Sequence, residues 1–256
     1  MRITRSIVPN LFTLANLFMG FMAIVHISGS EFVNGALFIL LAAVFDMLDG
    51  AVARLVRATS EFGAELDSLC DAVSFGVAPS FMAYKAFFYQ YGELGILLSS
   101  LPALAGVVRL ARFNVNMVGF EDKKFFTGLP IPSGALTVVS YIIFYHITDR
   151  LPEEYKAASM IAVVCLASLA MVSTIKYHNM PRPSPSAIKR NPVIFTIFVA
   201  GLVAAVVSGG AYIFPFMILY FVGDALRHFV LWLKKNYEAP DDIESDELEP
   251  DDEDDD

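Results

Sequence analysis

Residues 45–71 read FDMLDGAVARLVRATSEFGAELDSLCD and join the end of one apolar stretch to the start of the next. The segment carries four aspartates at the border between apolar sequence and a short polar connection, Asp46, Asp49, Asp67 and Asp71. The first two are three residues apart and the last two are four apart, so each pair shares one face of a helix. Two antiparallel helices joined here would direct all four carboxylates into one cleft.

Apolar sequence continues on both sides of this segment. Of the 256 residues, 56% are hydrophobic and 18% are charged, against roughly 25% charged in a soluble domain. The mean hydropathy of +0.57 excludes an ordinary soluble globule, and two cysteines exclude a disulfide scaffold. A helix that crosses a bilayer needs about 20 mostly apolar residues. We therefore predict an all-α polytopic membrane helix bundle with about eight transmembrane helices, near residues 8–28, 33–56, 66–90, 94–113, 128–148, 156–175, 192–209 and 211–233.

Basic residues predict the orientation of these spans. With eight spans both termini lie on one side, and if that side is the cytoplasm it receives fifteen Lys and Arg, against two, Arg150 and Lys156, outside. We therefore expect cytoplasmic termini, an inner (cytoplasmic) cell membrane location, and an aspartate segment that faces the cytoplasm. Reading the first span as a cleaved signal peptide is the alternative, but its removal would spoil this charge pattern.

The net charge of −9 comes from the C-terminal tail. Residues 238–256 contain thirteen acids and no Lys or Arg, and without them 18 bases face 14 acids. Such a run cannot bury enough apolar area to fold. We predict two regions, a membrane domain over residues 1–237 and an acidic disordered tail over residues 238–256.

Carboxylates in a membrane helix cost about 2.5–3.5 kcal/mol each on insertion scales, and four together also repel one another. Divalent cations would neutralise them, and ligation by oxygen alone suits Mg²⁺ or Mn²⁺. Two such ions could hold a diphosphate and stabilise both the attacking and the departing oxygen. The competing interpretation is that these acids are loop charges paired with Arg54 and Arg57.

The spacing of the segment favours the metal interpretation. It reads D-x-x-D-G-x-x-A-R-x8-G-x3-D-x3-D from Asp46 to Asp71, and it resembles the signature of the CDP-alcohol phosphatidyltransferase family. The stretches IVPNLFTLANLFMGFMAI at residues 7–24, RLARFN at 109–114 and FTGLPIPSGA at 126–135 are similar to family members whose acceptor is L-serine. The resemblance covers about residues 5–190.

The resemblance implies a reaction and a set of roles. The donor would be CDP-diacylglycerol, the acceptor L-serine, and the enzyme a homodimer in the membrane. Asp71 would complete the metal site and act as the general base. The metal ligands would be Asp46, Asp49, Asp67 and Asp71, and the CDP pocket would be shaped by Gly50, Ala53, Arg54 and Gly63.

Further candidates lie outside the signature. Arg109 and Arg112 are three residues apart at the predicted cytoplasmic end of a span, where one would hold the serine carboxylate or the lipid phosphate. The alternative is that both are membrane-interface anchors. Asn10 and Thr13, at the start of the first span, would contact the nucleotide by family similarity.

Two other functions remain open from the sequence. A related transferase could carry the same signature and use glycerol 3-phosphate or inositol phosphate as its acceptor. A cation-coupled transporter could also hold acids in the membrane, but such sites tend to lie near mid-bilayer in repeated halves. Here the acids cluster at the ends of two spans and no repeat is visible.

Overall fold

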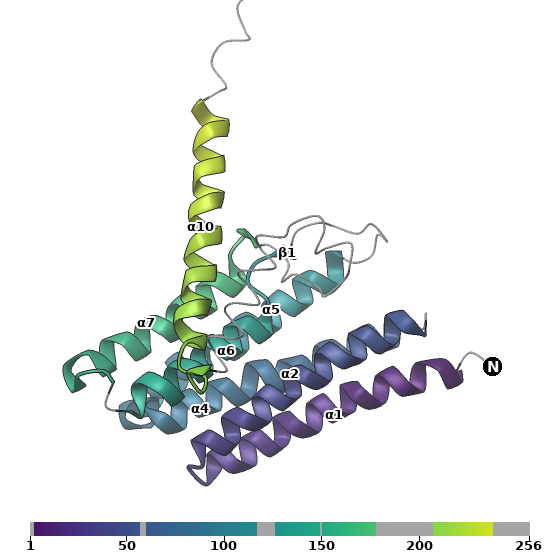
Figure 1. Ribbon diagram of the computed structural model, residues 1–256, viewed down its shortest axis with the longest axis horizontal. Helices are drawn as coiled ribbons and strands as arrows, with labels where there is room; N and C mark the ends of the chain where they lie inside the picture. Colours follow the sequence, from purple (N-terminus) through teal and green to yellow (C-terminus); the bar gives the residue numbers. More distant parts are fainter. Residues whose placement is uncertain (1–2, 57–59, 117–125, 149, 178–206, 238–256) are drawn as a thin grey trace, which may run out of the picture.

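The computed structural model describes residues 3–56, 60–116, 126–148, 150–177 and 207–237, and nearly all of these are helical. Helices α1 (Ile3–Ser28) and α2 (Phe32–Leu55) lie side by side as an antiparallel pair, and α10 (Ile213–Tyr237) projects away from the bundle (Figure 1). The other elements are α3 (Glu61–Asp71), η1 (Ala72–Val77), α4 (Ala78–Ala86), η2 (Phe88–Tyr91), α5 (Gly92–Asn116), β1 (Phe126–Thr127), α6 (Ile131–Tyr141), η3 (Ile142–His146), α7 (Glu153–Val172) and β2 (Lys176–Tyr177).

The turn between α1 and α2 is held by a small polar cluster. Ser30 adopts a left-handed conformation with φ of 63°, which reverses the chain within three residues. The Glu31 carboxylate accepts a hydrogen bond from Asn34 Nδ2 at 2.8 Å and lies 2.6 Å from His26 Nδ1. The hydrogen bond from Asn34, followed by the contact with His26, lowers the pKa of Glu31 below its ordinary value of 4.5. This cluster fixes the end of the α1–α2 pair that lies away from the aspartates.

The third predicted span is one continuous rod built from α3, the π-helix η1 and α4. It begins at Glu61 rather than near residue 66, because Ser60 caps it: the Ser60 Oγ accepts a hydrogen bond from Gly63 N at 3.0 Å. An N-cap serine satisfies a backbone donor that the first helical turn leaves unpaired. The first turn of α3 is polar, so hydropathy alone places the start of the rod too late.

Helix α6 lies at the centre of the bundle. Nine of its eleven residues are buried, and several are small, such as Ser133, Gly134 and Ala135. Small side chains let neighbouring helices approach closely in a membrane bundle. The buried core around α6 includes Ile131, Val138 and, from other elements, Phe75, Met82 and Met160.

A two-residue antiparallel ladder connects β1 with β2, and it is the one departure from the all-α expectation within the described residues. It pairs Phe126 with Tyr177 and Thr127 with Lys176. Gly128 follows with φ of 83°, and a Cβ there would lie 2.4 Å from Met171 O, so no other residue fits without strain. The ladder brings together two connections that the charge pattern assigns to the same membrane side.

Five helices in the described ranges are long and apolar enough to cross a membrane. Their outward side chains are apolar too; Leu11, Leu37 and Leu104 each expose more than half of their surface. Because water would disfavour such a surface, the chain is an integral membrane protein. The five segments are Ile7–Ser28, Phe32–Ala53, Phe88–Val115, Glu153–Val172 and Ile213–Leu233, and a shorter apolar helix covers Ile131–His146.

The predicted helical membrane fold is thus confirmed for the described residues, with the two-residue ladder as its exception. The predicted span at 192–209, apart from its last three residues, and the predicted tail at 238–256 lie outside them.

Candidate active site

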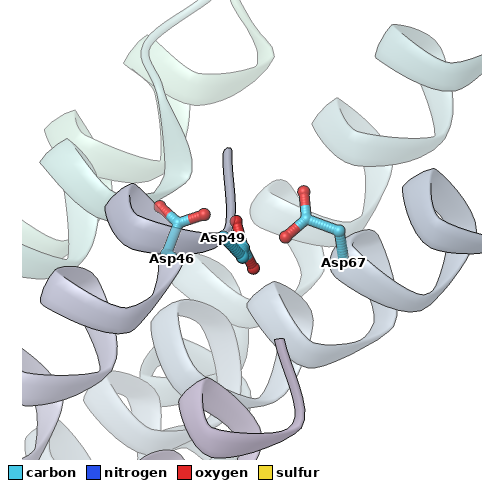
Figure 2. Close-up of side chains that lie close together, drawn as sticks. All are labelled: Asp46, Asp49 and Asp67. Atoms are coloured by element: carbon cyan, nitrogen blue, oxygen red, sulfur yellow. The ribbon is translucent and has the colours of Figure 1, made fainter. Parts of the chain in front are cut away.

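The carboxylates of three of the predicted aspartates meet between the last turns of α2 and the middle of α3. Figure 2 shows Asp46 and Asp49 on α2 and Asp67 on α3, with the Asp67 carboxylate directed toward Asp49. One carboxylate oxygen from each residue lies within 4.8 Å of the other two. Asp49 is 94% buried, and the other two are partly buried.

Local sequence explains this meeting. Asp46 and Asp49 lie one helical turn apart near the end of α2, so both point to the same side of that helix. The Ser60 cap sets where α3 begins, and Asp67 follows two turns later. Helix α3 packs against α1, which is itself paired with α2, and this arrangement brings the Asp67 carboxylate near the end of α2.

The electrostatics of this cluster call for a cation. Like charges about 4 Å apart repel by roughly 4 kcal/mol at a dielectric constant near 20. Asp67 Oδ1 is buried and accepts no hydrogen bond from any described residue. A buried acceptor without a donor is costly unless something else binds it.

The donor set fits a divalent cation. An octahedral Mg²⁺ holds oxygen ligands at about 2.1 Å, which places neighbouring ligand atoms roughly 3–4 Å apart. The three aspartate oxygens approach that spacing. Asp46, Asp49 and Asp67 could therefore hold a metal ion.

Asp71 lies one turn further along α3 and does not belong to this three-oxygen group. Its Oδ1 accepts a hydrogen bond from Asn16 Nδ2 at 3.0 Å, a contact between residues 55 positions apart. The sequence did not single out Asn16, although an amide within the apolar stretch LANLF was a signal. Asp71 remains close enough to Asp46 and Asp67 to interact with them electrostatically.

The two candidate arginines on α5 have different surroundings. Arg109 is 93% buried, interacts electrostatically with Asp71, and places its guanidinium 5.9 Å from the centre of the Phe113 ring. Arg112 instead donates from Nη2 to Val172 O at 2.9 Å and to Met171 O at 3.3 Å. These carbonyls end α7, where a cation also favours the helix dipole. Arg112 is thus engaged in structure, and Arg109 faces the site.

The remaining candidates divide between the first helix and the signature segment. Asn10 reaches α3: a Cβ on Gly63 would lie 3.4 Å from Asn10 Oδ1, so these two predicted residues are neighbours. Thr13 is buried and donates its hydroxyl to Pro9 O at 3.2 Å within its own helix. Gly50 and Ala53 follow Asp49 on α2 and are partly buried. The side chain of Arg54, in the last turn of α2, lies outside the described atoms.

Asn114, the last residue of RLARFN, contacts the helix that carries Asp67. Asn114 Nδ2 donates to Ser68 Oγ at 3.0 Å and to Glu65 Oε2 at 3.3 Å. Both acceptors lie on α3, next to Asp67. The end of α5 therefore braces the helix that carries two of the four aspartates.

Comparison with known proteins agrees with this geometry. Residues 6–175 match the model of a family described as CDP-alcohol phosphatidyltransferase, a range that includes the aspartate segment and the α5 arginines.

Several relatives align over most of this chain. A CDP-diacylglycerol–serine O-phosphatidyltransferase of Helicobacter pylori is 35% identical over 229 residues, which cover 88% of this chain and 92% of that protein. A protein of the same name from Methanocaldococcus jannaschii is 37% identical and covers 77% and 81%. An archaetidylserine synthase of Methanothermobacter thermautotrophicus is 40% identical and covers 66% and 68%.

Proposed function

Because the chain belongs to the CDP-alcohol phosphatidyltransferase family, we propose that it transfers the phosphatidyl group of CDP-diacylglycerol to the hydroxyl of L-serine, giving phosphatidylserine and CMP. The names of the aligned relatives support serine as the acceptor. The observation that carries the proposal is the meeting of Asp46, Asp49 and Asp67 at the signature positions, with Asp71 one turn away.

The reaction is a single in-line displacement. The serine hydroxyl oxygen forms a bond to the phosphorus that bears diacylglycerol, while the bond from that phosphorus to the bridging oxygen breaks and CMP leaves. The hydroxyl proton passes to the carboxylate of Asp71, which acts as the general base. A serine hydroxyl is a weak nucleophile at neutral pH and needs such a base.

The aspartate cluster supplies the binding site for the diphosphate. Asp46, Asp49 and Asp67, completed by Asp71, would hold Mg²⁺ or Mn²⁺, with two ions as the expected number. When bound, these ions neutralise the diphosphate and stabilise the oxygen that leaves with CMP. The four carboxylates would hold those ions at the ends of α2 and α3.

Separate groups hold the nucleotide and the serine. Asn10 and Gly63, which are neighbours, line the nucleotide side together with Gly50, Ala53 and Arg54; Thr13 supports the helix beside them. Arg109 binds the serine carboxylate or the lipid phosphate, because its guanidinium lies near Asp71. Arg112 is a weaker candidate because its Nη2 already binds the end of α7.

The site lies at the cytoplasmic face of the inner membrane, and both termini lie on that side, as the bias of Lys and Arg toward the cytoplasmic connections indicates. The β1–β2 ladder agrees with the placement of its two connections on one and the same side of the membrane, and the charge bias assigns that side to the cytoplasm. The membrane domain spans residues 1–237 and acts as a homodimer, and residues 238–256 form a separate acidic tail.

An acceptor panel tests the function. Purified protein receives CDP-diacylglycerol with labelled serine, glycerol 3-phosphate or inositol phosphate, and a parallel set omits the metal. We expect labelled phosphatidylserine and stoichiometric CMP only with serine and only with Mg²⁺ or Mn²⁺. Product from another acceptor would identify a sibling transferase, and no CMP release with any acceptor would reopen transport.

A further inference from the structure

Asn16 is completely buried between α1 and the rod formed by α3 and η1. Its side chain has no exposed surface, whereas Asp71, its hydrogen-bond partner, keeps 7% of its surface exposed. A substrate atom can therefore reach Asp71 but not Asn16. Any effect of Asn16 on the reaction must pass through its neighbour.

The hydrogen bond fixes the orientation of the Asp71 carboxylate. An ionised carboxylate accepts hydrogen bonds but cannot donate, so the amide must present its NH₂ group to Asp71. The amide donates to Oδ1 of Asp71 at 3.0 Å. A buried hydrogen bond to one oxygen restricts rotation of the carboxylate and leaves the other oxygen to take a proton.

A second contact fixes Asn16 itself. Ser74, three residues after Asp71 and therefore on the same side of the rod, donates its hydroxyl to the Asn16 backbone oxygen at 3.1 Å. Gly20 makes room for it, since a Cβ at that position would lie 2.2 Å from Ser74 Oγ. The rod thus binds Asn16 twice, once through its side chain and once through its backbone.

We propose that Asn16 is a positioning residue for the transfer reaction, which aims the free oxygen of Asp71 at the acceptor hydroxyl without contacting substrate. The inference rests on the proposed role of Asp71 as general base. It assigns a function to a residue of the first helix that lies outside the aspartate signature.

The test is Asn16→Leu, which keeps the size of the side chain and removes the amide donor. Loss of a group that orients a catalytic side chain typically costs about 10–100-fold in activity, and we expect a fall of this size in kcat. The KM values for CDP-diacylglycerol and serine should stay within about twofold, because no ground-state contact is lost. A kcat within twofold of the parent, or a rise in either KM that accounts for the loss, would overturn the proposal.

Ser74→Ala is the matched control. It removes the hydrogen bond from Ser74 to the Asn16 backbone oxygen, in the same contact between α1 and η1. The hydrogen bond from the Asn16 amide to Asp71 remains. Because the Asn16 amide keeps its own hydrogen bond to Asp71, we expect a smaller fall in kcat than in Asn16→Leu. Equal losses in both variants would mean that packing between α1 and η1 matters rather than the amide, and would overturn the proposal.

A double-mutant cycle covers the case in which Asn16→Leu folds poorly. Asn16→Leu and Asp71→Asn are combined, and residual CMP release is compared after normalising to folded protein measured by size-exclusion chromatography in detergent. If Asn16 acts through Asp71, its substitution has no further effect in the Asp71→Asn background. Additive losses would contradict this.

These experiments also distinguish a failure of the Asn16 role from a failure of the proposed function. If the parent enzyme prefers another acceptor, the serine assignment fails, and the Asn16 variants are then assayed with that acceptor. If Asp71→Asn alone retains full kcat, the general-base role fails. Loss of kcat in Asn16→Leu with a parent active on serine supports both.

Discussion

The two ends of the α1–α2 pair differ in how their acidic side chains are partnered. At the turn between the helices, Glu31 is exposed and is matched by Asn34 and His26 within a few residues of sequence. At the other end, the carboxylates of Asp46 and Asp49 lie close to the carboxylate of Asp67 on the next helix, so that like charges face one another. The first arrangement stabilises a turn; the second raises the energy of the empty site and so favours cation binding.

Removing metal should have the largest effect on activity, because it acts on the aspartate end of the α1–α2 pair and leaves the Glu31 turn unchanged. Dialysis against a chelator should abolish CMP release, and Mg²⁺ or Mn²⁺ should restore it. Asp49→Asn should lose activity that neither ion restores at concentrations sufficient for the parent, whereas Glu31→Gln should respond as the parent does. A chelator-treated enzyme with full activity would show that the cluster is not a metal site.

Asp71→Asn should come next. It removes the proposed base but keeps the size of the side chain, and general-base catalysis contributes about 10²–10⁴-fold. We expect a loss of kcat in this range, measured as CMP release at saturating serine. Glu65→Gln, an exposed acid on the same helix, is the control and should retain its rate. Similar losses in both would point to a general effect of charge on α3.

Substitutions of Arg109 and Arg112 should have different effects, one on serine binding and the other on stability. Arg109→Gln should raise the KM for serine by about 10–100-fold, since a hydrogen bond between charged groups contributes roughly 1.5–3 kcal/mol. Arg112→Gln should leave that KM unchanged and instead lower the unfolding temperature in detergent, because it uncaps α7. If the two variants exchange these phenotypes, Arg112 binds the substrate.

The turn should show the smallest effect, and one that depends on pH. The lowered pKa of Glu31 means that its ionised form stabilises the folded turn. This contribution is present above the unfolded pKa near 4.5 and is lost as the pH falls through the lower folded pKa. Glu31→Gln should therefore melt slightly below the parent at neutral pH, and this gap in melting temperature should close as the pH falls from the unfolded pKa through the lower folded pKa. A gap that is constant with pH would exclude the ionised carboxylate as its cause.

The sequence alone determined the features that repeat along one helix. Runs of apolar residues predicted α1, α2, α5 and α7, and the spacing of Asp46 with Asp49 placed both on one face of α2. These predictions succeed because helical periodicity and the length needed to cross a bilayer are properties of local sequence. The same spacing suggested that Asp67 would join them, and the structure brings the three together.

Tertiary contacts, which local sequence does not reveal, set which side chains lie near the aspartates and which stabilise the packing of the helices. Arg109 and Arg112 look equivalent three residues apart, yet one lies near Asp71 and the other caps α7. The contact from Asn16 to Asp71 spans 55 residues, and the β1–β2 ladder joins separate connections. Such contacts depend on how helices pack against one another, and packing is set by the shape of many side chains at once rather than by any local pattern.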